Sequence, residues 1–338
     1  MAAVQTERQC GNDATATAPF LPVRNAASGT SFAETQPPKP NYVEISGVRL
    51  PYLDWGGRGE PLVLAPGRCQ APYVFADLPP LLTRHFRVVG LTPRGCGHSE
   101  TAPNGYNVHR QIDELLEFLD TLGIRQETFE GHSSGGGKVV RLARWYPLRV
   151  NRIVTFDTIY RGVPDEFESK MDAALREKTG RPGKLSPESH RGEFPAWELG
   201  TWSAALAREF SEQTEVGPDG NISYRPQRAD WQAGFVSDVE EGRYFESIIL
   251  QPALLLVAQD LDIHRTRRFS ASQQRTLRPR AQRIAGERQK QMQEFRRNGP
   301  YVRVKWMPAA SKHLFVDRSQ EVAAEMLRFL RSTKALRR

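Results

Sequence analysis

The chain has 338 residues, of which 39% are hydrophobic, and it carries a formal net charge of +8. This length is enough for one large core, or for a core domain with a smaller covering domain. Because no apolar run approaches the roughly 18 residues that a membrane-spanning helix needs, the sequence excludes a transmembrane protein and predicts a soluble globular one.

Residues 1–40 are rich in Ala, Thr, Pro, Asn and Gln and show little periodicity, which indicates a flexible N-terminal extension. They contain neither the basic nor the apolar region of a signal peptide. The location therefore stays open between the cytoplasm and, if a signal peptide has already been removed, the cell exterior.

The folded region is expected to alternate strands with helices. Residues 42–55 alternate apolar and polar side chains, which predicts an antiparallel pair of strands. Further short apolar runs predict strands at 61–65, 86–91, 126–130, 152–156, 252–258 and 301–306. Helices are expected in a segment ending at Leu82 and over 108–122, 136–146 and 319–331. This alternation predicts an α/β fold with a mostly parallel, eight-stranded sheet that helices cover on both faces.

Two segments interrupt the alternation, so the predicted core comprises residues 41–159 and 246–338. Residues 160–245 contain helical stretches, three tryptophans and Gly/Pro breaks, which predict an inserted helical cap. The second segment is a basic helical insertion at about 263–298. Between Arg265 and Arg297 it holds 11 Lys/Arg and two acidic residues, a net charge of +9. The rest of the chain therefore carries a net charge of about −1.

The expected role of this basic insertion is that of a solvated amphipathic helix. The alternative is docking on an anionic polymer or membrane surface. Because aromatic interleaving and a nucleic-acid motif are both absent from the sequence, no nucleic-acid partner is expected.

Three cysteines, Cys10, Cys69 and Cys96, do not make a disulfide framework. Cys69 and Cys96 fall in two loops that could be neighbours, so one bridge between them is conceivable, but free buried thiols are the expectation. No Cys/His spacing suggests a metal site.

The stretch Gly131-His132-Ser133-Ser134-Gly135 reads G-x-S-x-G and lies between an expected strand and an expected helix. That context is the one in which a strained turn exposes a nucleophilic serine. A bulky side chain at either glycine would clash with the closely packed flanking chains, and the N-terminus of the following helix favours developing negative charge.

With these features the chain resembles an α/β-hydrolase with a helical cap, over roughly residues 42–335. The resemblance rests on five features in the family's order, namely the loop Pro66-Gly67-Arg68, the Arg-Gly-x-Gly-x-Ser loop 94–99, the Gly-His-Ser-Ser-Gly turn, a strand ending in Phe156-Asp157, and a late His313 before the last helix. Three positions depart from the family pattern. Pro66 replaces a His, Lys312 stands where a Gly usually precedes the His, and Leu261 occupies the usual Asp position.

The resemblance implies that Ser133 is the nucleophile and His313 its base, with His264 as the rival base. His132 is expected to pack rather than to react. The oxyanion hole is expected from the backbone N–H groups of Ser134 and Arg68.

The acid that orients the histidine is the open assignment. Asp157 ends the strand after the serine turn, a position that some branches of the family use. Asp262 and Asp260 flank the commoner position and are the alternatives, each one residue out of register. A purely structural role for Asp157 would be to cap a nearby amide.

These residues predict a serine hydrolase that cleaves a carboxylic ester of a small to medium, apolar substrate without metal or organic cofactor. Trp197, Trp202 and Trp231 of the cap are candidate substrate-binding residues. The alternatives are amide or C–C bond hydrolysis, or a non-catalytic ligand-binding or regulatory protein on the same fold. The oligomeric state is not predicted.

Overall fold

The computed structural model describes residues 37–67, 69–158, 203–218, 222–225, 249–259, 270–308 and 310–333. The chain divides into two compact units, 1–36 and 37–338, and the first lies outside the described residues. Most of the predicted cap, 160–245, also lies outside them, so the predicted domain boundaries remain a prediction.

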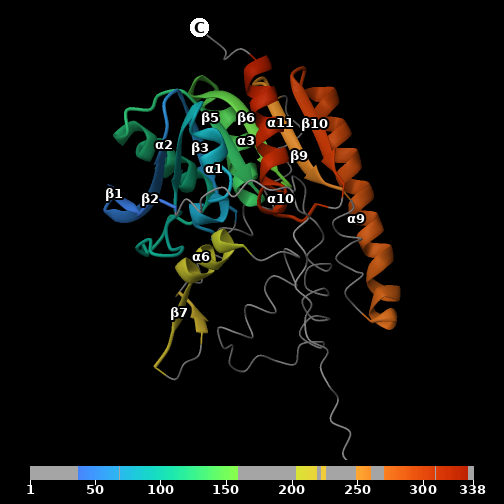
Figure 1. Ribbon diagram of the computed structural model, residues 1–338, viewed down its shortest axis with the longest axis horizontal. Helices are drawn as coiled ribbons and strands as arrows, with labels where there is room; N and C mark the ends of the chain where they lie inside the picture. The colour runs from blue at the N-terminus through green and yellow to red at the C-terminus, as the bar shows by residue number, and fades with distance from the viewer. Residues whose placement is uncertain are drawn as a thin grey trace, which may run out of the picture. The chain divides into compact units, whose positions relative to one another are not determined.

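An eight-stranded sheet forms the centre of the second unit (Figure 1). Its strands are β1 (Asn41–Ile45), β2 (Val48–Gly56), β3 (Glu60–Ala65), β4 (Phe86–Leu91), β5 (Glu127–His132), β6 (Val150–Phe156), β9 (Ala253–Ala258) and β10 (Val302–Met307). They lie in the order β1-β2-β4-β3-β5-β6-β9-β10, and only the pairings of β2 with β1 and with β4 are antiparallel. The predicted α/β fold with a mostly parallel, eight-stranded sheet is therefore confirmed.

Alternate residues of the central strands face two separate apolar layers. Val63, Phe129 and Ile153 face the layer formed with α2 (Val108–Thr121), α3 (Ser134–Trp145) and part of α9 (Ala271–Asn298). Leu62 and Leu64 face the layer formed with α1 (Pro79–Leu82), α10 (Leu314–Asp317) and α11 (Ser319–Ser332). Burial on both faces explains why these strands read as continuous apolar runs.

The helix expected up to Leu82 is shorter than predicted. A 3₁₀ turn, η1 (Pro72–Phe75), and the four-residue α1 replace it, and η2 (Pro147–Arg149) follows α3. Prolines begin both short helices of the first segment. A proline is tolerated in the first turn of a helix but cannot continue an earlier one, which divides the segment.

The described part of the basic segment forms helix α9, which begins with a capping box between Ser270 and Gln273. Its buried side chains recur at helical spacing, at Leu277, Ala281, Ile284, Arg288, Gln291, Met292 and Phe295. The expected amphipathic helix is thus present. None of the described helices is both long enough and apolar enough to cross a membrane.

The described part of the predicted cap consists of α6 (Ala204–Gln213) and the pair β7 (Thr214–Val216) and β8 (Ile222–Tyr224). Helix α6 packs on η1, and the buried Glu209 accepts a hydrogen bond from Ala71 N at 2.7 Å. Burial raises the pKa of Glu209 to about 8. This part of the cap region therefore covers the chain that follows β3.

Candidate active site

Ser133 lies in the tight turn between β5 and α3. Its backbone has φ 52° and ψ −121°, a conformation that costs a non-glycine residue about 1–3 kcal/mol. A Cβ on Gly131 would come within 2.5 Å of the Gly136 backbone, and one on Gly135 within 2.1 Å of Ala65 O. The glycines therefore permit the close approach of β5, α3 and β3, as the motif predicts.

The loop after β3 approaches Ser133 and carries Gln70. A Cβ built on Gly67 would lie 3.4 Å from Ser133 Cβ, which places this loop beside the serine. Gln70 Oε1 accepts from Gly67 N at 3.2 Å and lies 3.1 Å from His132 Nδ1. Its Nε2 lies 3.0 Å from His313 Nε2. One carboxamide thus joins the loop, the serine turn and the late histidine.

His313 is held at the start of α10 by a compact loop. Ser311 donates from its N and its Oγ to Asp317, each at 2.7 Å, and Ser311 Oγ accepts from His313 N at 3.1 Å. The imidazole is 1% exposed, and its ring centroid is 4.5 Å from that of His132. Burial, with a smaller contribution from Lys312, holds the pKa of His313 well below its usual value. The ring is therefore neutral, as a general base must be.

Asp157 follows β6 directly and is 1% exposed. Its Oδ1 accepts from Ala258 N at 3.0 Å and from the buried Arg288 of α9. The guanidinium favours the ionised carboxylate. This candidate acid therefore caps a strand amide and forms a buried ion pair with a helix of the basic segment.

The remaining predicted site residues lie outside the described part of the chain. They are Arg68, Trp197, Trp202, Trp231, Asp260, Asp262 and His264. Among the described residues, no group of three or more His, Cys, Asp or Glu is arranged to hold a metal ion.

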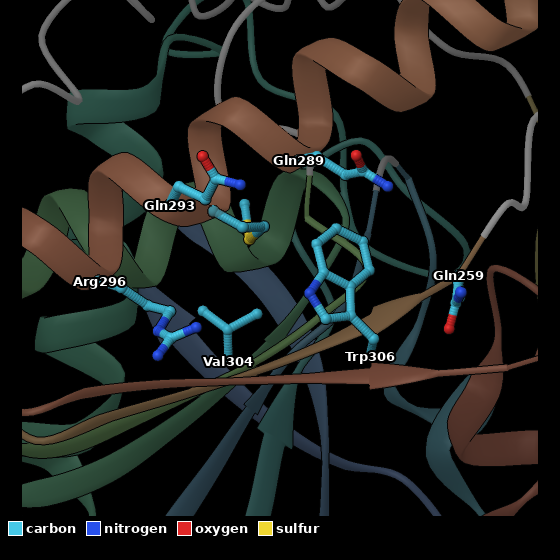
Figure 2. Close-up of a pocket in the computed structure, with 7 residues that line it drawn as sticks. Gln259, Gln289, Gln293, Arg296, Val304 and Trp306 are labelled. Carbon is cyan, nitrogen blue, oxygen red and sulfur yellow. The ribbon is translucent and has the colours of Figure 1, made fainter.

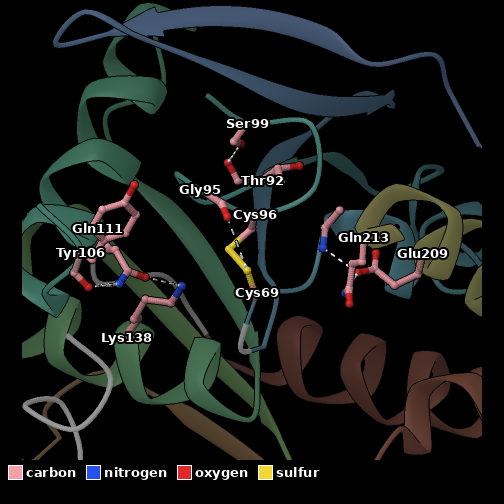
Figure 3. The surroundings of a disulfide bond; sticks show 11 residues. Cys69, Thr92, Gly95, Cys96, Ser99, Tyr106, Gln111, Lys138, Glu209 and Gln213 are labelled. Atoms are coloured by element: carbon pink, nitrogen blue, oxygen red, sulfur yellow. Dashed lines mark hydrogen bonds between the residues drawn. A yellow bond between two sulfur atoms is a disulfide. The ribbon is translucent and has the colours of Figure 1, made fainter. Parts of the chain in front are cut away.

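Cys69 and Cys96 form a disulfide, so the expectation of free thiols was wrong (Figure 3). Their Cα atoms are 5.0 Å apart. Strands β3 and β4 are adjacent and parallel, so the loops that follow them leave the same edge of the sheet side by side. The bridge joins the Gln70 loop to the Arg-Gly-x-Gly-x-Ser loop.

A pocket lies away from these residues, between α9 and β10 (Figure 2). It is lined by Gln259, Gln289, Met292, Gln293, Arg296, Val304 and Trp306. Neither Ser133 nor His313 contributes to its lining.

The profile of a family described as "alpha/beta hydrolase fold" matches residues 60–260, which is more than half of the chain. The chain belongs to the α/β-hydrolase family.

Its sequence similarity to curated proteins covers only part of each chain. It is 31% identical to mouse "Bifunctional epoxide hydrolase 2" over 46% of this chain and 30% of the relative. It is 33% identical to "2-heptyl-3-hydroxy-4-quinolone dioxygenase AqdC2" of Rhodococcus erythropolis over 38% of this chain and 48% of the relative. The crystal structure of E-2-(acetamidomethylene)succinate hydrolase matches with a TM-score of 0.62 at 18% identity, covering 86% of this chain and 98% of that one. The matched regions thus span less than half the length of either sequence relative.

Two residues of this candidate site were not predicted from the sequence, Gln70 and Arg288. Gln70 follows Gly67 by three residues, and a polar side chain so soon after the start of the expected oxyanion loop is the signal that could have indicated it. Arg288 is one of many arginines in the basic segment, but it falls at helical spacing with the apolar residues Ile284 and Met292, and that position is the signal that could have indicated it.

Proposed function

We propose that the chain is a serine hydrolase that cleaves a carboxylic ester of a small to medium, apolar substrate through an acyl-enzyme on Ser133. The observation that carries this proposal is the position of Ser133. It is half-buried in a strained turn, beside the Gln70 loop that follows β3. The side chains of His132, His313 and Gln70 form a cluster next to this turn.

In the proposed mechanism, Ser133 Oγ attacks the substrate carbonyl carbon while His313 Nε2 takes the hydroxyl proton. The backbone N–H groups of Ser134 and Arg68 hold the oxyanion. The intermediate collapses, the C–O bond breaks, and His313 donates its proton to the leaving alcohol. Water then attacks the acyl-enzyme by the same route and releases the acid and Ser133.

For the acid, we propose Asp157, with Asp262 and Asp260 as the alternatives. A base that accepts a proton at Nε2 carries a hydrogen on Nδ1, and that hydrogen needs a carboxylate acceptor. Among the described residues His313 Nδ1 has no hydrogen-bond partner. Asp157 supports the assignment because it ends the strand next to the serine strand and Arg288 favours its ionised form.

The names of the relatives do not select the reaction, because they include an epoxide hydrolase and a dioxygenase. The residue in the turn supports acyl chemistry. An aspartate at the position of Ser133 would favour epoxide or haloalkane hydrolysis, whereas a serine favours an acyl-enzyme. Amide and C–C bond hydrolysis use the same intermediate and are variants of the proposal.

A non-catalytic, ligand-binding role is the second candidate, and two contacts favour it. The amide nitrogen of Gln70 is hydrogen-bonded to His313 Nε2, and Arg288 is hydrogen-bonded to Asp157 Oδ1. A protein that had lost its reaction would tolerate both contacts.

The test is turnover of p-nitrophenyl esters from acetate to octanoate by the wild type, Ser133→Ala and the control Ser211→Ala, which alters an exposed serine of α6. We expect the wild type and the control to be active and Ser133→Ala to lose at least about a thousandfold in kcat. The acyl chain length that is hydrolysed fastest would indicate the size of the pocket to which we assign Trp197, Trp202 and Trp231.

If no ester is turned over, a fluorophosphonate probe decides between the candidates. Labelling of Ser133 would mean that the serine is an active nucleophile and that the enzyme accepts a narrow range of substrates. Absence of labelling supports the non-catalytic role.

A further inference from the structure

The orientation of the Gln70 carboxamide is determined by its neighbours. Gly67 N can only donate a hydrogen bond, so the Gln70 atom that faces it at 3.2 Å is the oxygen. His132 Nδ1, 3.1 Å from the same oxygen, must then be the donor as well. The NH₂ group of Gln70 is left to face His313.

This orientation fixes the tautomer of His313. An amide NH₂ has hydrogens and no lone pair to offer, so His313 Nε2, 3.0 Å away, must accept. In a neutral imidazole one nitrogen carries the hydrogen and the other accepts. Its hydrogen is therefore on Nδ1.

We propose that Gln70 is a positioning residue that holds His313 as the Nδ1–H tautomer, with Nε2 free of a proton and aimed at the serine turn. The inference rests on the proposed role of His313 as the base. A serine hydrolase needs this tautomer, and the wrong one costs about 10⁴-fold in kcat in the best-studied triad. Gln70 selects the tautomer before substrate arrives, and its NH₂ yields the lone pair to the Ser133 hydroxyl at the start of each cycle.

The surroundings keep Gln70 in place. Its backbone N donates to Gly67 O at 3.2 Å, which closes a turn over the loop. The neighbouring Cys69 is bonded to Cys96 and so ties the turn to the loop after β4. Among the described residues, the titratable side chains beside His313 are His132, whose ring is tilted against it, and Lys312, the preceding residue in the chain. Burial keeps His132 neutral by holding its pKa well below its usual value, so Gln70 is the neighbour that supplies a donor to Nε2.

The test compares Gln70→Glu and Gln70→Leu with Gln111→Glu. Gln111 is a matched control because it is also half-buried and hydrogen-bonded through both amide atoms, but it lies on α2 and contacts Tyr106 and Lys138 (Figure 3). The first readout is the ¹⁵N NMR spectrum of the full chain with labelled histidine, in which the His313 signals are assigned from a His313→Gln variant. The second is the pH profile of Ser133 labelling by a fluorophosphonate.

We expect His313 in the wild type and in Gln111→Glu to be the Nδ1–H tautomer. A carboxylate at position 70 accepts instead of donating, so Gln70→Glu should place the hydrogen on Nε2 or charge the ring. Its labelling should fall at least about tenfold at pH 7, and the midpoint of its pH profile should move to higher pH. Gln70→Leu, which offers neither donor nor acceptor, should show a mixture of tautomers and a smaller loss.

An Nε2–H tautomer in the wild type, or the same tautomer in all three Gln70 forms, overturns the proposal. These spectra are informative whether or not the enzyme turns over a substrate. Complete absence of labelling in the wild type, together with an Nδ1–H spectrum that Gln70→Glu reverses, would refute the serine-hydrolase function and leave the positioning role of Gln70 intact.

Discussion

Strands β5 and β6 are adjacent and parallel, and the residue that follows each one has the same unusual backbone. Ser133 after β5 has φ 52°, and Asp157 after β6 has φ 43°, although neither is glycine. Their surroundings differ. Ser133 is half-buried beside Gly67, whereas Asp157 is sealed in the interior against Arg288. The backbone therefore brings a hydroxyl and a carboxylate to one edge of the sheet, and the neighbours of each determine how accessible it is.

The largest effect is expected from Asp157→Asn. If Asp157 orients His313, the amide favours the wrong tautomer, and kcat for the best p-nitrophenyl ester should fall about 10⁴-fold. Asp262→Asn is the control and should stay within about tenfold. A larger loss in Asp262→Asn than in Asp157→Asn would assign the acid to Asp262 and leave Asp157 with a structural role alone.

Arg288→Met tests how strongly the position of Asp157, at the end of β6, depends on its ion pair. The substitution removes the Arg288 guanidinium from the buried Asp157 carboxylate, which should cost about 3–5 kcal/mol in the free energy of unfolding. Urea denaturation measures this cost, with the exposed Arg296→Met of the same helix as the control. Equal stability of the two variants would mean that the pair contributes nothing to holding Asp157.

The double variant Cys69→Ser, Cys96→Ser tests how far the surroundings of Ser133, at the end of β5, depend on the disulfide. Loss of a bridge between residues 27 apart in sequence should lower the free energy of unfolding by about 3 kcal/mol. Because the bridge holds the Gln70 loop beside Ser133, fluorophosphonate labelling should fall as well. Unchanged labelling in a destabilised variant would show that the loop keeps its position without the bridge.

The smallest effects are expected when Ser133 and Asp157 are each replaced by glycine, and these two variants compare the strand ends most directly. Glycine relieves the strain at either φ, so Ser133→Gly should raise the free energy of unfolding by about 1 kcal/mol. Asp157→Gly should lower it, because the loss of the buried ion pair outweighs the relief. Thermal unfolding of the two variants side by side checks the sign of each change, and a stabilised Asp157→Gly would contradict the comparison.

The sequence predicts well what short stretches of chain determine. The order of strands and helices, the turn around Ser133 and the loop that carries His313 are all predicted, because glycine spacing and apolar periodicity act locally. The contact between Gln70 and His313 spans 243 residues, and that between Asp157 and Arg288 spans 131. Such contacts depend on the order of strands in the sheet, as does the Cys69–Cys96 bridge, which the sequence predicted wrongly.

The ion pair between Asp157 and Arg288 also has a consequence for biosynthesis. A ribosome adds about 5–20 residues per second, so the 131 residues between the partners represent a delay on the order of ten seconds. During that time β6 exists without the arginine that neutralises its terminal carboxylate. Arg288 is synthesised only with α9, and His313 is made later still. The ion pair at the end of β6 can therefore form only late in synthesis, once α9 has left the ribosome.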